Sequence, residues 1–149
     1  MTQSTFPPVL EAPRVALRIG LGLAAFLAGL DKFIGLLADW PGYLAPVVAG
    51  MLPVSPEAFM RAVGVIEMLV GLAILTQWTR EGAWIAAAWL LLIAVNLVLT
   101  GRFFDVAVRD VEMAIAAFAL ARLTEAHAAA GLGHARIVAS RGERAEHAA

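Results

Sequence analysis

Four long apolar stretches dominate the pattern of hydrophobic and polar positions, and short polar segments separate them. The clearest stretch runs from 82 to 101 and holds no charged residue. A helix needs about 20 apolar residues to cross a bilayer. The other stretches run from about 13 to 38, 56 to 78 and 106 to 123. The pattern therefore predicts an all-α fold, a bundle of four transmembrane helices within residues 1–124.

A proline-rich segment separates the first two predicted spans. Four prolines lie between positions 41 and 56, and the apolar middle of the segment, 43–52, is too short to span a bilayer. Proline interrupts helices because it lacks a backbone N–H. We predict an interfacial cap or a shallow re-entrant segment here. The next helix is expected to begin at Pro56, with Ser55 as its N-cap.

The last part of the chain, 125–149, is a polar, alanine-rich tail. We expect it to form a short amphipathic helix that frays towards the end. Four spans place both termini on one side of the membrane. Loops that stay in the cytoplasm are enriched in Lys and Arg, which predicts a multi-pass inner-membrane protein with cytoplasmic termini. The terminal side would carry seven basic residues, Arg14, Arg18, Arg80, Arg122, Arg136, Arg141 and Arg144, against Lys32, Arg61, Arg102 and Arg109 on the other side.

Composition narrows the class of protein. The 149 residues are 61% hydrophobic and 15% charged, whereas a soluble domain is about 45–50% apolar and about 25% charged. These values argue against a disordered chain and an ordinary soluble enzyme. A net charge of −1 supplies no field to recruit nucleic acid. The bilayer is the expected surrounding, and a protein partner or a second copy is the expected contact.

The chain has no cysteine, and its three histidines all lie at or after position 127. Disulfides, thiol catalysis and iron–sulfur clusters are therefore excluded. The hydrophobic body offers no histidine for haem, and we expect no metal. Intramembrane chemistry would have to use carboxylates, Lys, Arg, Asn or a bound cofactor.

Polar residues within the predicted spans converge on one half of the membrane. Glu67 lies about ten residues into its helix, roughly 15 Å deep. A charge at the bilayer centre costs about 2.5–3.5 kcal/mol, so such groups should pair or reach water. We predict a polar pocket between the helices, open to the outer side. Its candidate ligand-binding residues are Asp31, Lys32, Asn96, Arg109, Asp110 and Glu112, with Glu67.

Glu67 is the candidate proton carrier or hydrogen-bond donor, because deep burial disfavours a charged carboxylate. It could equally be a structural ion-pair partner. Residues 31–32 could mark the end of a short span, and 109–112 a solvated helix start. Asn96 suits inter-helix contact at least as well as ligand binding.

Small residues share faces with the charged ones. Gly64 and Gly71 flank Glu67 on one helical face, and Gly22 and Gly29 share a face of the first helix. Glycine lets membrane helices approach closely. We therefore expect Glu67 to face a packed neighbour instead of lipid.

Four short motifs resemble those of the DoxX family, in their order and spacing over residues 14–124. They are Arg18-Ile-Gly-Leu-Gly22, Ala28-Gly-Leu-Asp-Lys32, Gly64-Val-Ile-Glu67-Met-Leu-Val-Gly71 and Asp105-Val-Ala-Val-Arg109-Asp110. The resemblance implies a small four-helix membrane protein. The family takes its name from a subunit of a thiosulfate:quinone oxidoreductase, and other members are linked to membrane redox complexes. It implies a shared polar core at Arg18, Asp31, Lys32, Glu67, Arg109 and Asp110.

Three functions fit these features. The first is an accessory or membrane subunit of a quinone-linked oxidoreductase, in which Glu67 exchanges the proton and Arg109 or Lys32 contacts a quinone oxygen. Asn96 would orient the ring, and Trp89 or Phe33 would pack against it. The second is a non-catalytic membrane anchor or assembly factor. The third is a small proton-coupled transporter, which the charge-free stretch 82–95 disfavours.

Overall fold

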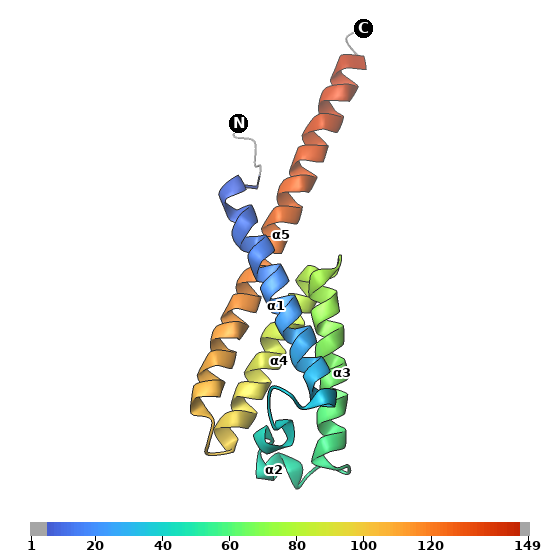
Figure 1. Cartoon of the computed structure of the whole chain (residues 1–149). Helices are drawn as coiled ribbons and strands as arrows, with labels where there is room; N and C mark the ends of the chain where they lie inside the picture. The colour runs from blue at the N-terminus through green and yellow to red at the C-terminus, as the bar shows by residue number, and fades with distance from the viewer. Residues whose placement is uncertain (1–5, 147–149) are drawn as a thin grey trace.

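The computed structural model describes residues 6–146, and every regular element in that range is helical. Between the first two long helices lie a 3-10 helix and a single turn of α-helix. This confirms the all-α prediction, and the proline-rich segment forms short helical turns between two long helices (Figure 1). The elements are α1 (Pro8–Ile34), η1 (Trp40–Tyr43), α2 (Pro46–Ala49), α3 (Pro56–Leu75), α4 (Thr79–Leu99) and α5 (Phe104–Glu146).

Three helices in the described range, α1, α3 and α4, are long and apolar enough to cross a membrane. The protein is therefore a helical membrane protein. The part of α5 beside the other helices is also rich in alanine and valine. Residues 106–123 of α5 are less apolar because four charged residues interrupt them, Arg109, Asp110, Glu112 and Arg122.

The first helix begins and ends earlier than the predicted span of 13–38. It begins at Pro8. Proline fits at this position because the backbone N–H groups of the first turn have no acceptor within the helix, so no hydrogen bond is lost. It ends at Ile34, and Gly35 then takes a left-handed conformation with φ 71°. The carboxylate of Asp31 accepts backbone N–H groups of the two residues after this glycine, at 2.9 Å each, which folds the chain back.

The next two helices also differ at one end from the predicted spans. α3 begins at Pro56, as expected, and the Ser55 hydroxyl accepts the N–H of Ala58 at 3.2 Å. It ends at Leu75 and not at 78, and α4 begins at Thr79 and not at 82. The buried Thr79 hydroxyl donates to the carbonyl of Ile74 at 2.9 Å, which tightens this turn.

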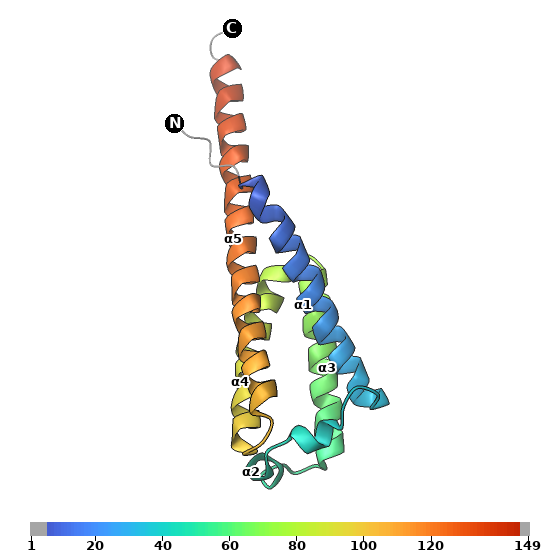
Figure 2. The ribbon, with the colours of Figure 1, turned by 60° about the vertical axis from the view of Figure 1, so that its left-hand side comes forward.

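The fourth predicted span and the predicted tail helix form one continuous helix. α5 has 43 residues, so no break separates 106–123 from the segment that begins at 125. Alanine favours helix strongly enough for the pattern to continue. Figures 1 and 2 show α5 extending well beyond the other helices. Residues 147–149 of the predicted tail lie outside the described range.

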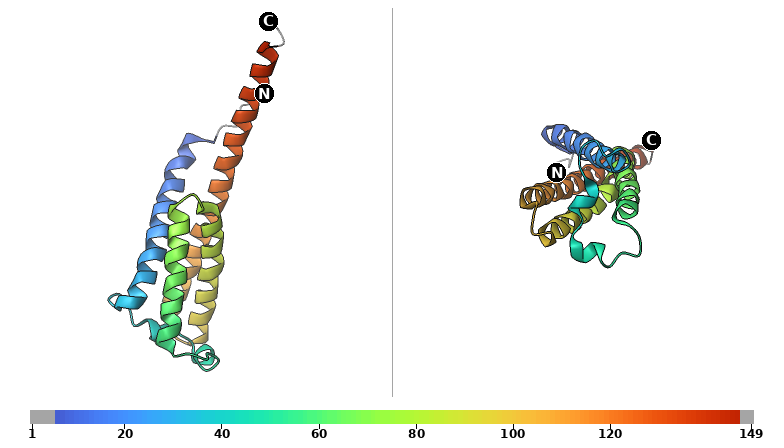
Figure 3. Two further views of the ribbon diagram at one scale, coloured as in Figure 1. Left: turned by 90° about the vertical axis from the view of Figure 1, so that its right-hand side faces the viewer. Right: turned by 60° about the horizontal axis from the view of Figure 1, so that its bottom comes forward.

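The four long helices pack as two pairs. α1 lies along α3, and α4 lies along α5, while fewer contacts join α3 to α4 and α1 to α5 (Figure 3). The cap and the α4–α5 turn lie at one end, and α1 begins at the other. The main core joins both pairs and consists of Leu21, Val70, Ile74, Ala83, Ala86, Ala87, Ala117, Leu120 and Ala121.

Glycine brings the backbones of α1 and α3 into direct contact. A methyl group on Gly64 would lie 2.6 Å from the carbonyl oxygen of Gly29, and one on Gly71 would lie 2.7 Å from that of Gly22. Real side chains do not tolerate such distances. The predicted close packing of these two faces is confirmed.

Candidate functional site

A buried ion pair joins α1 to α3. The Nζ of Lys32 lies 2.5 Å from Oε2 of Glu67, and the two side chains are 4% and 9% exposed. The glycines make room for this pair. A Cβ at Gly64 would lie 3.0 Å from Cβ of Lys32, and a Cβ at Gly29 would lie 3.0 Å from Cβ of Glu67. Each charged residue therefore lies over a glycine of the opposite helix.

The other two long helices each add a polar group beside Glu67. Trp89 comes from α4, and the buried Asp110 comes from α5. Within the described residues, the Trp89 indole Nε1 is buried and makes no hydrogen bond of full geometry, although it lies close enough to the Glu67 carboxylate to interact with it. We call Lys32, Glu67, Trp89 and Asp110 the central cluster. All four long helices thus contribute to one polar site inside the bundle.

Two predicted residues of α5 lie at the edge of this site or outside it. The Arg109 guanidinium is 3.5 Å from the Asp110 carboxylate, but the Arg109 side chain is 64% exposed. Glu112 is exposed as well. Two positions along a helix correspond to about 200° of rotation, so Glu112 and Asp110 point in nearly opposite directions. Arg109 can still supply a positive charge to the cluster from its rim.

Asp31 organises the loop that covers the cluster. Besides its two backbone contacts, its carboxylate accepts the indole N–H of Trp40 at 2.8 Å. The Lys32 ammonium lies 3.7 Å from the centroid of that indole ring, a cation–π contact. The carboxylate therefore holds Trp40 in place, and Trp40 covers the outer side of the ion pair.

Asn96 fastens the cap to α4. Its Nδ2 donates to the carbonyl of Tyr43 at 2.8 Å, and its Oδ1 accepts the N–H of Ala45 at 3.0 Å. The Tyr43 ring also packs edge-on against Phe103, with centroids 4.5 Å apart. Both polar groups of Asn96 are thus engaged by backbone atoms of the cap, so Asn96 joins α4 to the cap and not to another long helix.

Arg18 lies far from the central cluster, at the opposite end of the α1–α3 pair. Its guanidinium donates to the carbonyls of Ile74, Leu75 and Thr76 at 3.1, 2.7 and 2.8 Å. These carbonyls have no partner within α3, because they end the helix. The DoxX resemblance groups Arg18 with the polar core, whereas the structure makes it the C-terminal cap of α3.

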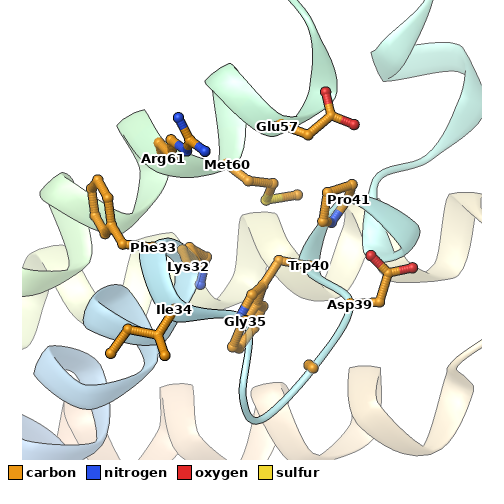
Figure 4. A pocket seen from close by; sticks show the side chains of 11 residues that line it. Lys32, Phe33, Ile34, Gly35, Asp39, Trp40, Pro41, Glu57, Met60 and Arg61 are labelled. Atoms are coloured by element: carbon orange, nitrogen blue, oxygen red, sulfur yellow. The ribbon is translucent and has the colours of Figure 1, made fainter.

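An open pocket of about 350 Å³ lies at the cap end of the cluster, between the end of α1, the cap and the start of α3 (Figure 4). We call it the outer pocket, because the cap is predicted to lie on the outer side. Two of its lining residues were predicted from the sequence, Lys32 as a ligand contact and Phe33 as a packing residue. The sequence did hold a signal for Asp39, because it is the only charged residue between Phe33 and Ser55. The pocket is lined by Lys32, Phe33, Ile34, Gly35, Ala38, Asp39, Trp40, Pro41, Glu57, Met60 and Arg61.

No protein-family model, curated protein or solved structure matches the chain. In the described residues, no group of three or more His, Asp or Glu side chains is placed to hold a metal ion. The class of protein therefore rests on the fold and the site themselves. They define a helical membrane protein with a buried ion pair at the point where four helices meet.

Proposed function

We propose that the protein crosses the inner membrane four times, with α5 as the fourth span and both termini in the cytoplasm. α5 packs along the apolar α4 and contributes the buried Asp110 to the bundle. Its remaining charges near the cap lie within its first turns, close to the expected membrane surface. An even number of spans also agrees with α1 beginning at the end of the bundle from which α5 emerges (Figure 1).

We further propose that this is a DoxX-like accessory or membrane subunit of a quinone-linked oxidoreductase. The observation that carries the proposal is the central cluster, in which the buried Trp89 N–H lies near the Glu67 carboxylate without forming a hydrogen bond of full geometry. A buried donor without an acceptor costs about 1–3 kcal/mol. Because the Trp89 N–H is poorly placed on Glu67, it bears part of this cost, and a ligand carbonyl oxygen would give it a well-formed hydrogen bond. A quinone supplies two such oxygens on an apolar ring.

The residues of the cluster have separate roles in this proposal. Trp89 donates its N–H to one quinone oxygen, and Lys32 holds the Glu67 carboxylate in place next to the ring. Glu67 holds or releases the proton, since a general acid or base must lie within one hydrogen bond or one water of its target. A bound quinone supplies two-electron, two-proton redox chemistry, and a partner redox protein supplies or accepts the electrons.

Binding of a short-chain quinone to the purified protein tests this proposal. Trp89→Phe removes the N–H and keeps an aromatic ring, so it should weaken binding about tenfold, the factor for one hydrogen bond of about 1.4 kcal/mol. Trp84→Phe is the matched control, because the Trp84 N–H donates to the surface residue Glu125 instead. Equal binding by the wild type and Trp89→Phe would contradict the proposed role of this N–H.

A membrane anchor or assembly factor is the second candidate, and one observation favours it. The polar groups of Asp31 and Asn96 bind backbone atoms of the loop and the cap. These two of the predicted site residues therefore stabilise the fold and are not open to a ligand. This alternative predicts that substitutions in the central cluster lower the amount of protein and leave the activity per molecule unchanged.

A proton-coupled transporter is the third candidate. It would need a polar path through the inner half of the bundle. That half is filled by apolar side chains, including Leu21, Ile74 and Leu120, each at most 8% exposed. Proton-driven uptake of a substrate into sealed vesicles would raise this candidate above the other two.

A further inference from the structure

The outer pocket collects the charges of an otherwise apolar region. Between Phe33 and Ser55 the only charged residue is Asp39. It lines the pocket together with Glu57 and Arg61 from the first turns of α3 (Figure 4). By chance, the carboxylate of Asp39 could lie on any face of the cap. Its position opposite two α3 charges points to a shared ligand.

The three charges remain open to a ligand. Asp39, Glu57 and Arg61 make no ion pair within 4 Å in residues 6–146, although Glu57 and Arg61 lie one turn apart on α3 and attract each other. Lys32 also lines the pocket, but its ammonium is turned to Glu67 and is nearly inaccessible. The pocket therefore offers one cation and two carboxylates that no close ion pair holds. That arrangement complements a zwitterion.

The surroundings of the pocket match the surface of a bilayer. Ile34, Leu36 and Leu37 follow the pocket edge and are 64%, 81% and 69% exposed. A contiguous exposed apolar patch of this kind marks a membrane or protein contact. Trp40 belongs to the type of residue that is enriched at the membrane interface. The pocket is thus at the level of phospholipid headgroups, with an apolar surface beside it for acyl chains.

We propose that the outer pocket binds the phosphoethanolamine headgroup of a zwitterionic phospholipid. Arg61 pairs with the phosphate, for which its forked guanidinium is suited. Asp39 and Glu57 accept N–H groups of the ammonium. A primary ammonium, with three donors, fits two carboxylates better than a quaternary one. The pocket volume of about 350 Å³ falls in the range of small-ligand sites, about 300–1,000 Å³.

This site is independent of the proposed quinone chemistry. The Lys32 ammonium and the Trp40 ring separate the pocket from the rest of the central cluster. Substitution of Glu67 by Gln should therefore leave lipid selectivity unchanged. A failure of either proposal does not affect the other.

Native mass spectrometry of the detergent-purified protein tests the lipid site. Phosphatidylethanolamine, phosphatidylcholine and phosphatidylglycerol of equal chain length are titrated separately. The wild type should retain phosphatidylethanolamine about tenfold better than the other two, the factor that one charge-assisted hydrogen bond supplies. The double variant Asp39→Asn with Glu57→Gln should remove this preference. Arg61→Gln should reduce retention of both phosphatidylethanolamine and phosphatidylglycerol.

Arg102→Gln serves as the control for loss of one positive charge at the same end of the bundle, because Arg102 is exposed and lies in the α4–α5 turn. It should bind lipid as the wild type does. Equal retention of all three lipids by the wild type would overturn the proposal. Equally tight binding of glycerophosphoethanolamine, which has no acyl chains, would assign the pocket to a soluble zwitterion and overturn the lipid assignment.

Discussion

Lys32 and Glu67 meet at 2.5 Å although 35 positions separate them. Their contact depends on Gly29 and Gly64, because each charged side chain lies over the glycine of the opposite helix. The ion pair and the close helix packing are therefore one feature. A change in either should disturb the other.

A methyl group at the helix crossing should loosen the bundle. Gly64→Ala places a Cβ 2.6 Å from the carbonyl oxygen of Gly29, where only backbone movement can relieve the clash. We expect a loss of about 1–3 kcal/mol, the usual effect of overpacking. Thermal unfolding in detergent measures it. Gly20→Ala is the control, since nothing lies within 4 Å of its added methyl group, and it should not lower the midpoint.

Removal of one partner of the ion pair should be far more harmful than removal of both. Lys32→Met leaves Glu67 buried without its cation, which costs about 3–5 kcal/mol. The double variant Lys32→Met with Glu67→Gln contains no uncompensated charge and should recover much of that loss. A double-mutant cycle on unfolding free energies measures the coupling. Additive losses would contradict the description of this pair as mutually dependent.

The cap should become mobile when Asn96 loses its amide. Asn96→Leu removes the hydrogen bonds to Tyr43 and Ala45, each worth about 0.5–1.5 kcal/mol. Hydrogen exchange followed by mass spectrometry should show faster exchange in residues 43–52 and little change in α3. Val95→Leu, at an exposed neighbouring position, should behave as the wild type. Faster exchange throughout the bundle would show that Asn96 supports more than the cap.

Arg18 should stabilise α3 from its C-terminal end. Arg18→Gln leaves at least part of the three carbonyl contacts unmade, and we expect a loss of about 1–3 kcal/mol. Arg80→Gln, which breaks an exposed pair with Glu81, should cost at most about 1 kcal/mol. Thermal unfolding of both variants compares them. Similar losses would argue against a specific cap.

The hydrophobic pattern was sufficient to predict α1, α3 and α4, because long apolar stretches and prolines leave few alternatives, but it did not predict that 106–123 and the tail form one helix. It also predicted the glycine faces that bring α1 and α3 together, since 3- and 4-residue spacing fixes which residues share a side. The ends of helices were less accurate. Those ends depend on side chains such as Asp31 and Arg18, which bind backbone groups beyond a helix end or on another helix. The local spacing of apolar residues does not predict such contacts.

Depth along a helix, the basis of the predicted site, could not show which polar side chains meet. Rotation about the helix axis decides that, and it separates Asp110 from Glu112. Depth also gave no reason to treat Asn96 as a cap contact, because its partners are backbone atoms in an irregular segment. Trp40, Trp89 and Arg61 gained their roles only through the packing of four helices and the cap.

Purification from native membranes in mild detergent tests the proposed quinone-linked function most directly, with mass spectrometry of the organic extract and of co-purifying proteins. The wild type should carry a quinone and a redox partner in near-stoichiometric amounts. Glu67→Gln, Trp89→Phe and the control Trp84→Phe are compared at equal protein. We predict that the control retains as much quinone as the wild type and that Trp89→Phe retains less. Glu67→Gln should slow turnover of the native complex. A wild-type protein with neither quinone nor redox partner would contradict this account.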